Sequence, residues 1–247
     1  MKFRDPDKEQ KRTFALIYGE TGVGKTVSTL MTAPRPILYF ECEPRPVERT
    51  AEGIDMTDIK IAHPENFFDL FDFVSENQKK IAEKYKTVFI DSLSFLMNVT
   101  LLGEIEEESA KAEVFNTEKR PIVSLGRTDW AGYGALGSLM KRLCALLGKT
   151  AVEGSIVICS ALLDDRPKWN RELSAAPAFA GKDFPRDMPS YFDIIGLVEE
   201  RKNEQGEVIY PPIIRVKSDG SFLAKWTGKP LKGSYGVLDW KKILEYA

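Results

Sequence analysis

The chain has 247 residues, of which 43% are hydrophobic and 29% charged. This balance is typical of a soluble globular protein with room for one sizeable core, and it excludes collagen, low-complexity disorder and a small disulfide framework. No apolar run reaches the roughly 18 residues of a membrane span, and the charged N-terminus, MKFRDPDKEQKR, is unlike a secretory signal. The 35 Lys and Arg residues nearly balance the 37 Asp and Glu residues, so any contact with nucleic acid must come from a local patch.

The cysteine and histidine content predicts neither a disulfide framework nor a zinc site. Cys42, Cys144 and Cys159 are widely spaced in or beside apolar segments, so we expect buried thiols in a reducing compartment. The one histidine, His63, has no Cys or His neighbour at ligand spacing. We therefore expect a cytoplasmic protein with no membrane partner.

Strands and helices are predicted to alternate along the first two thirds of the chain. Short apolar runs that predict buried strands occupy residues 14–18, 37–40, 87–90 and 155–159. Segments with the features of helices occupy residues 25–32, 66–84 and 130–147. This alternation predicts an α/β fold, a mostly parallel sheet flanked by helices.

The pattern changes after residue 193. Strand-like segments follow one another with turn residues, and no helix-length segment, between them, at residues 194–199, 208–216 and 222–226. They predict a C-terminal antiparallel β-meander that extends the sheet.

No repeat or linker divides the chain, so we expect a tail over residues 1–12 and a single domain over residues 13–247. Two stretches, residues 103–128 and 161–189, have no predicted element. Loops of this length inside a compact domain are usually functional or mobile.

Residues 19–26, GETGVGKT, match the phosphate-binding motif G-x-x-x-x-G-K-[ST], between a predicted strand and a predicted helix. The glycines let backbone N–H groups turn toward phosphate oxygens, and the helix directs its positive end at the same anion. Lys25 is expected to reach the β- and γ-phosphates, and the Thr26 hydroxyl to ligate Mg²⁺. The residues expected to contact the nucleotide are Gly19, Glu20, Thr21, Gly22, Val23, Gly24, Lys25, Thr26 and Val27.

An apolar strand that ends in a carboxylate, TVFID at residues 87–91, is the expected partner of this loop. Asp91 would lie beside the bound Mg²⁺, usually through a water molecule. Glu41 and Glu43 follow the second strand, at the edge where parallel sheets bind their ligands. Either glutamate is placed to polarise the water that attacks the γ-phosphate, and spacing alone does not choose between them.

ATP is the favoured nucleotide, because the N-K-x-D motif that reads guanine in GTPases is absent. A small-molecule kinase is an alternative, since such enzymes use an arginine-rich lid and residues 161–189 supply several cations. Three aromatic residues of the same stretch, Trp169, Phe179 and Phe184, are expected to be exposed and to stack on nucleic-acid bases.

The order of these features resembles the core ATPase domain of the RecA superfamily. The phosphate loop is followed by a strand ending in Tyr39-Phe-Glu-Cys-Glu43, a strand ending in Asp91-Ser92, and the meander. Finer features resemble the compact phage-encoded RecA-like ATPases of the single-strand annealing type, namely Asp129-Trp-x-x-Tyr133, KDFPRDMPSYFD at residues 182–193, and Ala224-Lys225. The resemblance covers residues 12–230.

This resemblance implies roles for further residues. The last glutamate after the second strand activates the attacking water in RecA-like proteins, which implies that role for Glu43. Ser160 occupies the place of a polar residue that senses the γ-phosphate. The stretches at residues 103–128 and 161–189 match the two DNA-binding loops. The residues implied to contact single-stranded DNA are Arg127, Arg166, Lys168, Trp169, Arg171, Lys182 and Arg186.

The resemblance further implies a homo-oligomer, a ring or short filament, that acts with ATP and Mg²⁺ on single-stranded DNA. Its setting would be phage recombination or replication in the host cytoplasm, with a phage or host single-strand binding protein as a further partner. Phage relatives end the meander with Ala-Lys-Asp-Arg, offered to the neighbouring subunit's ATP. Here the residues are Ala224-Lys225-Trp226-Thr227, so Lys225 is present without the arginine. An alternative function is an ATP-switched assembly or loading factor that binds a protein partner through the acidic residues 103–118 and does not bind DNA.

Overall fold

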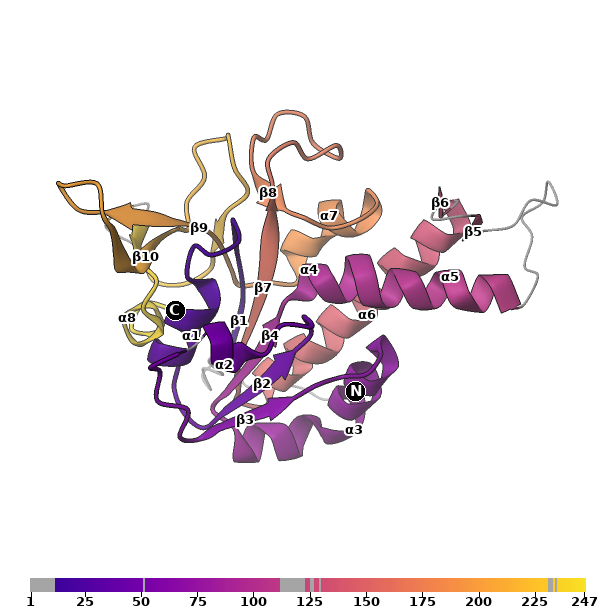
Figure 1. Ribbon diagram of the computed structural model, residues 1–247, viewed down its shortest axis with the longest axis horizontal. Coiled ribbons are helices and arrows are strands. Elements are labelled where there is room, and N and C mark those ends of the chain that lie inside the picture. Colours follow the sequence, from indigo (N-terminus) through magenta and orange to yellow (C-terminus); the bar gives the residue numbers. More distant parts are fainter. Residues whose placement is uncertain are drawn as a thin grey trace.

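The structure is a computed structural model that describes residues 12–50, 52–111, 123–124, 127–128, 130–230, 233 and 235–247. Its centre is a mostly parallel sheet with helices on both faces, and antiparallel strands extend this sheet near the C-terminus (Figure 1). This architecture confirms the fold class that the sequence predicts.

The main sheet of the described residues has ten strands, in the order β12-β10-β9-β1-β7-β4-β2-β3, with β11 beside β9 and β8 beside β7. Neighbours from β3 to β9 are parallel, whereas β8, β10, β11 and β12 pair in the antiparallel direction. The strands are β1 (Thr13–Gly19), β2 (Ile37–Glu41), β3 (Ile59–Ala62), β4 (Thr87–Asp91), β7 (Ile156–Asp164), β8 (Ala176–Pro177), β9 (Ile194–Lys202), β10 (Val208–Arg215), β11 (Lys225–Trp226) and β12 (Tyr235–Val237). Two short strands, β5 (Val123–Ser124) and β6 (Arg127–Thr128), form a separate pair.

The strand order places β7 between β1 and β4. In the register, Cys159 of β7 lies opposite Leu16 of β1 on one side and Ile90 of β4 on the other. The ends of β1, β7 and β4 therefore meet at one edge of the sheet, where ligands of parallel sheets bind.

Each face of the sheet carries its own hydrophobic core, because successive side chains of a strand point to opposite faces. Along β1, Ala15 and Ile17 belong to one core, whereas Phe14, Leu16 and Tyr18 belong to the other. The first core is covered by α1 (Lys25–Thr32), α2 (Val47–Thr50) and α8 (Trp240–Leu244). The second is covered by α3 (Phe67–Lys84), α4 (Leu93–Phe95), the π-helix η1 (Leu96–Leu101), α5 (Leu102–Lys111), α6 (Trp130–Val152) and α7 (Asp183–Asp187), and the 3₁₀-helix η2 (Met188–Ser190) follows α7.

The sequence located the central elements more accurately than the peripheral ones. The four strands with apolar runs and the helix after the phosphate loop form as expected. The strand predicted at residues 222–226 is reduced to β11, because Phe222 instead bridges to Ala175. The stretch at residues 161–189 begins as the end of β7 and contains β8 and α7. The short elements β3 and α8 were not predicted, because Lys60 interrupts the apolar residues of β3 and α8 has only five residues.

The C-terminal helix α8 anchors α1, the helix that follows the phosphate loop. Trp240 is fully buried. Its indole N–H donates to the Thr29 hydroxyl (3.2 Å), and its backbone N–H donates to the Thr32 hydroxyl (3.0 Å). Two polar side chains of α1 are thereby satisfied by a segment from the far end of the chain.

Part of the acidic segment at residues 103–118 has a structural role. Glu104 on α5 accepts a hydrogen bond from the backbone N–H of Phe67 at the start of α3 (2.6 Å). Burial raises the pKa of Glu104, and the hydrogen bond from Phe67 opposes this rise. A carboxylate at a helix N-terminus satisfies a backbone donor that has no partner within the helix. Residues 112–118 of this segment lie outside the described residues.

Of the tail expected at residues 1–12, the structure describes Arg12, which packs with the domain. Its guanidinium lies 3.2 Å from the carboxylate of Asp193, and the same carboxylate accepts from the backbone N–H of Phe14 (3.0 Å). The expectation of a single domain over residues 13–247 stays a prediction. No helix in the described part of the chain is long and apolar enough to cross a membrane.

Candidate active site

The glycine-rich loop between β1 and α1 has a backbone that only glycine adopts easily. Gly22 and Gly24 have φ angles of 82° and 98°, in the left-handed region. Gly19 lies so close to β9 that a Cβ atom there would be 2.4 Å from the Val198 carbonyl oxygen. Val23 is buried in the core on the α1 side of the sheet. Packing of Val23 and Gly19 against the domain therefore holds the loop in place. Its residues Glu20, Thr21 and Gly22 are exposed to solvent.

Lys25, the first residue of α1, is a buried cation with no ion pair to any residue that the structure describes. Its side chain is 8% exposed, and its Nζ donates to the carbonyl oxygens of Gly19 (2.9 Å) and Glu20 (2.8 Å). Burial lowers the pKa of Lys25, and the negative charges of Asp91 and Glu43 oppose this shift. Two neutral carbonyl groups of the loop thus bind the ammonium group of Lys25. Its positive charge remains available to a bound anion.

The Asp91 carboxylate, at the end of β4, is surrounded by hydroxyl groups. It accepts from Thr26 (2.6 Å), from Tyr39 (3.0 Å) and from Ser160. Burial and the neighbouring Asp91 raise the pKa of Tyr39, so its hydroxyl stays protonated and donates. Alternation along β2, β4 and β7 turns Tyr39, Asp91 and Ser160 toward the same face as α1, because Tyr39, Phe89 and Ile158 all belong to that face's core.

The two glutamates after β2 occupy different environments. Glu43 lines the pocket at the phosphate loop and accepts a hydrogen bond from the Ser92 hydroxyl (2.7 Å). Glu41 is buried beside it, where it accepts from the backbone N–H of Val47 and lies 2.9 Å from Nδ1 of His63. Burial raises the pKa of Glu41. Glu43 lines this pocket and Glu41 does not, a distinction that the spacing of the two residues leaves open.

The pocket gathers residues from four sequence regions. Its lining consists of Thr21, Gly22, Lys25, Thr26, Tyr39, Glu43, Arg45, Val47, Asp91, Ser92, Ser160 and Leu162. The sequence did not point to Tyr39, Arg45 or Ser92. Tyr39 has the same strand parity as Glu41 and Glu43 and was recognisable on that ground, whereas Arg45 follows a turn whose path no local pattern predicts.

The oxygen ligands at this site fit a magnesium ion. The Thr26 hydroxyl and the Asp91 carboxylate are in direct contact, and Mg²⁺ takes hard oxygen ligands, usually one or two from protein and the rest from phosphates and water. Among the described residues, no group of three or more His, Cys, Asp or Glu side chains is placed to hold a metal by itself. The donor set suits a metal that arrives with a phosphate ligand.

Lys225 lies outside this pocket. It begins β11, opposite Ile195 of β9, and its Nζ donates to the carbonyl oxygen of Pro189 (2.9 Å). Its pairing partner Ile195 lies three residues before Val198, the residue of β9 that lies against Gly19. Lys225 therefore does not line the pocket of its own chain.

The residues expected to contact DNA differ in how exposed their side chains are. Four cations of the stretch at residues 161–189 are exposed, namely Arg166, Lys168, Arg171 and Lys182. Trp169 is partly buried, and its indole N–H has no hydrogen-bond partner among the described residues. The side chain of Arg127 lies outside what the structure describes.

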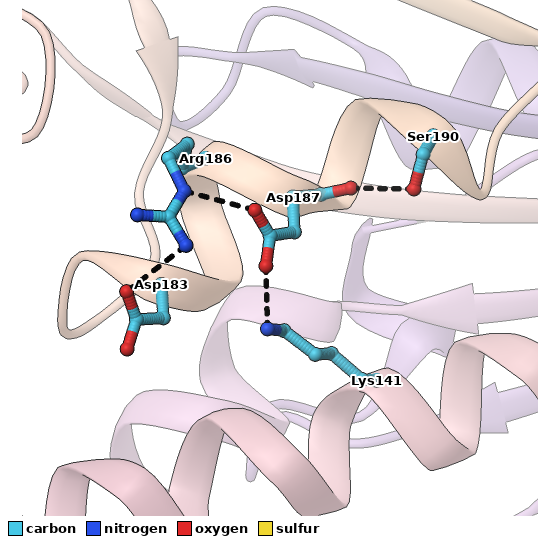
Figure 2. Close-up of polar contacts among 5 residues, drawn as sticks. All are labelled: Lys141, Asp183, Arg186, Asp187 and Ser190. Carbon is cyan, nitrogen blue, oxygen red and sulfur yellow. Dashed lines mark hydrogen bonds and ion pairs between the residues drawn. The ribbon is translucent and has the colours of Figure 1, made fainter.

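Arg186 is a cation neutralised by its neighbours. Figure 2 shows its guanidinium between Asp183 (3.2 Å) and Asp187 (2.9 Å), with Asp187 also bound by Lys141 of α6 (2.6 Å). The hydrogen bonds from Arg186 and Lys141 lower the pKa of Asp187 to about 2. The pair between Lys141 and Asp187 ties α7 to α6. The charge of Arg186 is balanced by two carboxylates of its own helix.

The expectation that Phe179 and Phe184 are exposed was wrong. They are 6% and 1% exposed, and their rings pack against each other with centroids 5.0 Å apart. Burial in the core on the α6 side stabilises these apolar rings and leaves them inaccessible to nucleic-acid bases. These residues anchor the segment that follows β8, and they are not a surface for bases.

The comparison with protein-family models gives a match over most of the chain. The model described as AAA domain, which is a P-loop NTPase family, matches residues 11–226. No curated protein matches the chain. The matched residues include the phosphate loop, Asp91 and the meander as far as Trp226.

Proposed function

The chain belongs to the AAA-domain family of P-loop NTPases, and from this premise we propose that it is a RecA-like ATPase that couples ATP hydrolysis to the binding of single-stranded DNA. The setting we propose is phage recombination or replication. Nucleotide binding and ATPase activity in general follow from the family. The DNA substrate and the coupling are the proposal.

One observation carries the coupling. Ser160 on β7 donates a hydrogen bond to Asp91 inside the pocket, and the same strand continues to Asp164 and into the exposed segment with Arg166 and Lys168. This continuity supports the proposal that a change at the phosphate end of β7 reaches the candidate DNA-binding residues along the strand. Segments of this kind become ordered or released with the state of a γ-phosphate.

The residues of the pocket have distinct roles in the proposed hydrolysis. Lys25 stabilises negative charge on the β- and γ-phosphates, together with backbone N–H groups of the loop. Glu43, oriented by Ser92, accepts a proton from the water that attacks the γ-phosphate. Thr26 and Asp91 would hold Mg²⁺, which supplies charge neutralisation at the phosphates when bound. Ser160 and Tyr39 fix the orientation of the Asp91 carboxylate.

The proposed DNA site consists of the exposed cations of the segment after β7. Arg166 and Lys168 are exposed and have no ion pair to any residue in the described part of the chain. Contacts between such cations and phosphates are salt dependent, because each contact releases a counterion. Arg186 is not part of this site, since Asp183 and Asp187 neutralise it.

The test is salt-dependent binding of an oligo(dT) strand to the wild-type chain with MgATP, measured beside ATP turnover. We expect the logarithm of affinity to fall linearly with the logarithm of salt. The double variant R166A/K168A should reduce that slope by about 1.4, at about 0.7 per lost contact. R186A is the matched control and should leave the slope unchanged. ATP turnover without any salt-dependent DNA binding would contradict the DNA role and leave the ATPase assignment intact.

A further inference from the structure

We infer that Tyr210 on β10 is the platform on which the base of the bound nucleotide stacks. This inference deepens the proposed function, on which it rests. The phosphate loop does not contact the base end of the nucleotide, and Tyr210 is a large aromatic side chain beside that loop.

Tyr210 lies directly against the phosphate loop. A Cβ atom built on Gly24 would be 2.6 Å from Cε1 and 3.3 Å from Cδ1 of Tyr210, and 3.6 Å from Cδ of Pro212. Gly24 immediately precedes Lys25, the cation of the loop. The absence of a side chain at Gly24 therefore allows an aromatic ring to approach within contact distance of the backbone that binds phosphate.

Tyr210 is also unusually exposed for a residue in contact with the fold. Its side chain is 56% exposed, and its hydroxyl has no hydrogen-bond partner among the residues that the structure describes. A ring that lies against glycine while most of its surface faces solvent costs free energy of hydration unless a ligand covers it. The neighbouring Pro211 and Pro212 hold this part of β10 in a defined backbone geometry.

The direction of the nucleotide follows from the strand order. The groups that meet the terminal phosphate, Asp91 and Glu43, lie on the β4 and β2 side of β1. The strands β9 and β10 lie on the opposite side of β1, and Figure 1 shows the β9–β10 hairpin on the side of α1 away from β4. A nucleotide whose terminal phosphate meets Asp91 extends across the loop in the other direction. Its base then reaches the strand that carries Tyr210.

The ligand class is an aromatic nucleobase attached to a polyphosphate. Every base has a π-face, so a tyrosine platform binds bases by stacking with little discrimination among them. Tyr210 should therefore increase the affinity for nucleotides and not the affinity for free polyphosphate.

The experiment compares the affinities of the chain for MgATP and for inorganic tripolyphosphate with magnesium, by isothermal titration calorimetry. The variant Y210A should weaken ATP binding by about 5- to 150-fold and leave tripolyphosphate binding unchanged. Y210F keeps the ring and should bind ATP as the wild type does. Y246A removes a tyrosine of comparable exposure near the C-terminus, 46% exposed, and should change neither affinity.

Equal loss of both affinities in Y210A would overturn the inference, because it would mean that the ring only supports the loop through Gly24. Unchanged affinities in Y210A would overturn it as well. If the wild-type chain binds neither ligand, the nucleotide site itself fails and the proposed function falls with it. Wild-type binding of both ligands separates the two questions.

Discussion

Two clusters of charged side chains in this protein are built in opposite ways. In the pocket, Lys25 is held by carbonyl oxygens and Asp91 by hydroxyl groups, so neither charge is cancelled by the fold. Between α6 and α7, Arg186 and Lys141 pair directly with aspartates (Figure 2). The first arrangement leaves opposite charges for a ligand to complete, and the second consumes them in holding two helices together.

The difference has a physical reason. Keeping a buried cation without a counter-charge costs free energy, as the lowered pKa of Lys25 indicates. A fold that accepts this cost gains binding energy when an anion arrives. The exposed pairs of α7 cost little and contribute little, because solvent screens them. Removing charges from each cluster should therefore have very different consequences.

The largest effect is expected for Lys25→Ala. Loss of this buried cation removes the side chain that stabilises the phosphates, and ATP binding should fall below detection, with hydrolysis lost as a consequence. Calorimetric titration with MgATP measures this. Lys149→Ala, which removes an exposed lysine of α6, is the matched control and should bind ATP normally. Tight ATP binding by Lys25→Ala would contradict the assignment of the phosphate loop.

Glu43→Gln should keep ATP binding and slow hydrolysis by about 10²- to 10⁴-fold, the range for loss of a positioned general base. Single-turnover hydrolysis separates this effect from binding. Glu41→Gln is the matched comparison, because Glu41 is held by Val47 and His63 outside the pocket lining. It should lower the thermal unfolding midpoint and slow the chemical step much less. A slower chemical step in Glu41→Gln than in Glu43→Gln would reverse the roles.

Lys225 resembles Lys25 in that its Nζ donates to a backbone carbonyl, that of Pro189. Substitution of Lys225 therefore tests whether its charge acts at the site of a neighbouring subunit. An arginine supplied in this way is worth about 10³- to 10⁵-fold in rate, and a lysine lacks the forked donors of arginine. Lys225→Ala should therefore reduce turnover by less than about 10³-fold without changing ATP affinity.

Mixing Lys225→Ala with Glu43→Gln should restore part of the activity, since one shared site would then be whole. The recovery should increase with protein concentration, because it depends on assembly. A mixture that stays as inactive as its components at every concentration would show that sites are not shared through Lys225.

The smallest effect is expected for Asp187→Asn in the paired cluster. The pKa of Asp187 is lowered to about 2 from an ordinary value of 3.8, so the network contributes stability fully above the ordinary value and loses it as the pH falls toward 2. Asp187→Asn should lower the thermal midpoint slightly at about pH 6, with ATP affinity unchanged. The difference from the wild type should shrink between about pH 4 and pH 2. A constant difference across this range would mean that the charge of Asp187 is irrelevant.

The local features of the pocket were predictable from the sequence, and their relationships were not. The loop at residues 19–26 has a conformation set by its own glycines and by the helix that follows, so a pattern of eight residues suffices to locate it. Asp91 was located by the apolar strand before it. The choice between Glu41 and Glu43 depended on the turn that follows β2 and on Val47, which returns to bind Glu41.

The fold follows the same division. Short apolar runs predicted β1, β2, β4 and β7, because an apolar segment is buried whichever segments surround it, and helical spacing predicted α3. The helix α1 was predicted from its place after the phosphate loop. Only the tertiary structure decided which strands are neighbours and where charges are cancelled. It placed Tyr210 against Gly24, Trp240 against Thr29, and Lys141 against Asp187. Each of these contacts joins groups that are far apart in the sequence and interact only at short distance. Only the completed fold therefore brings them together.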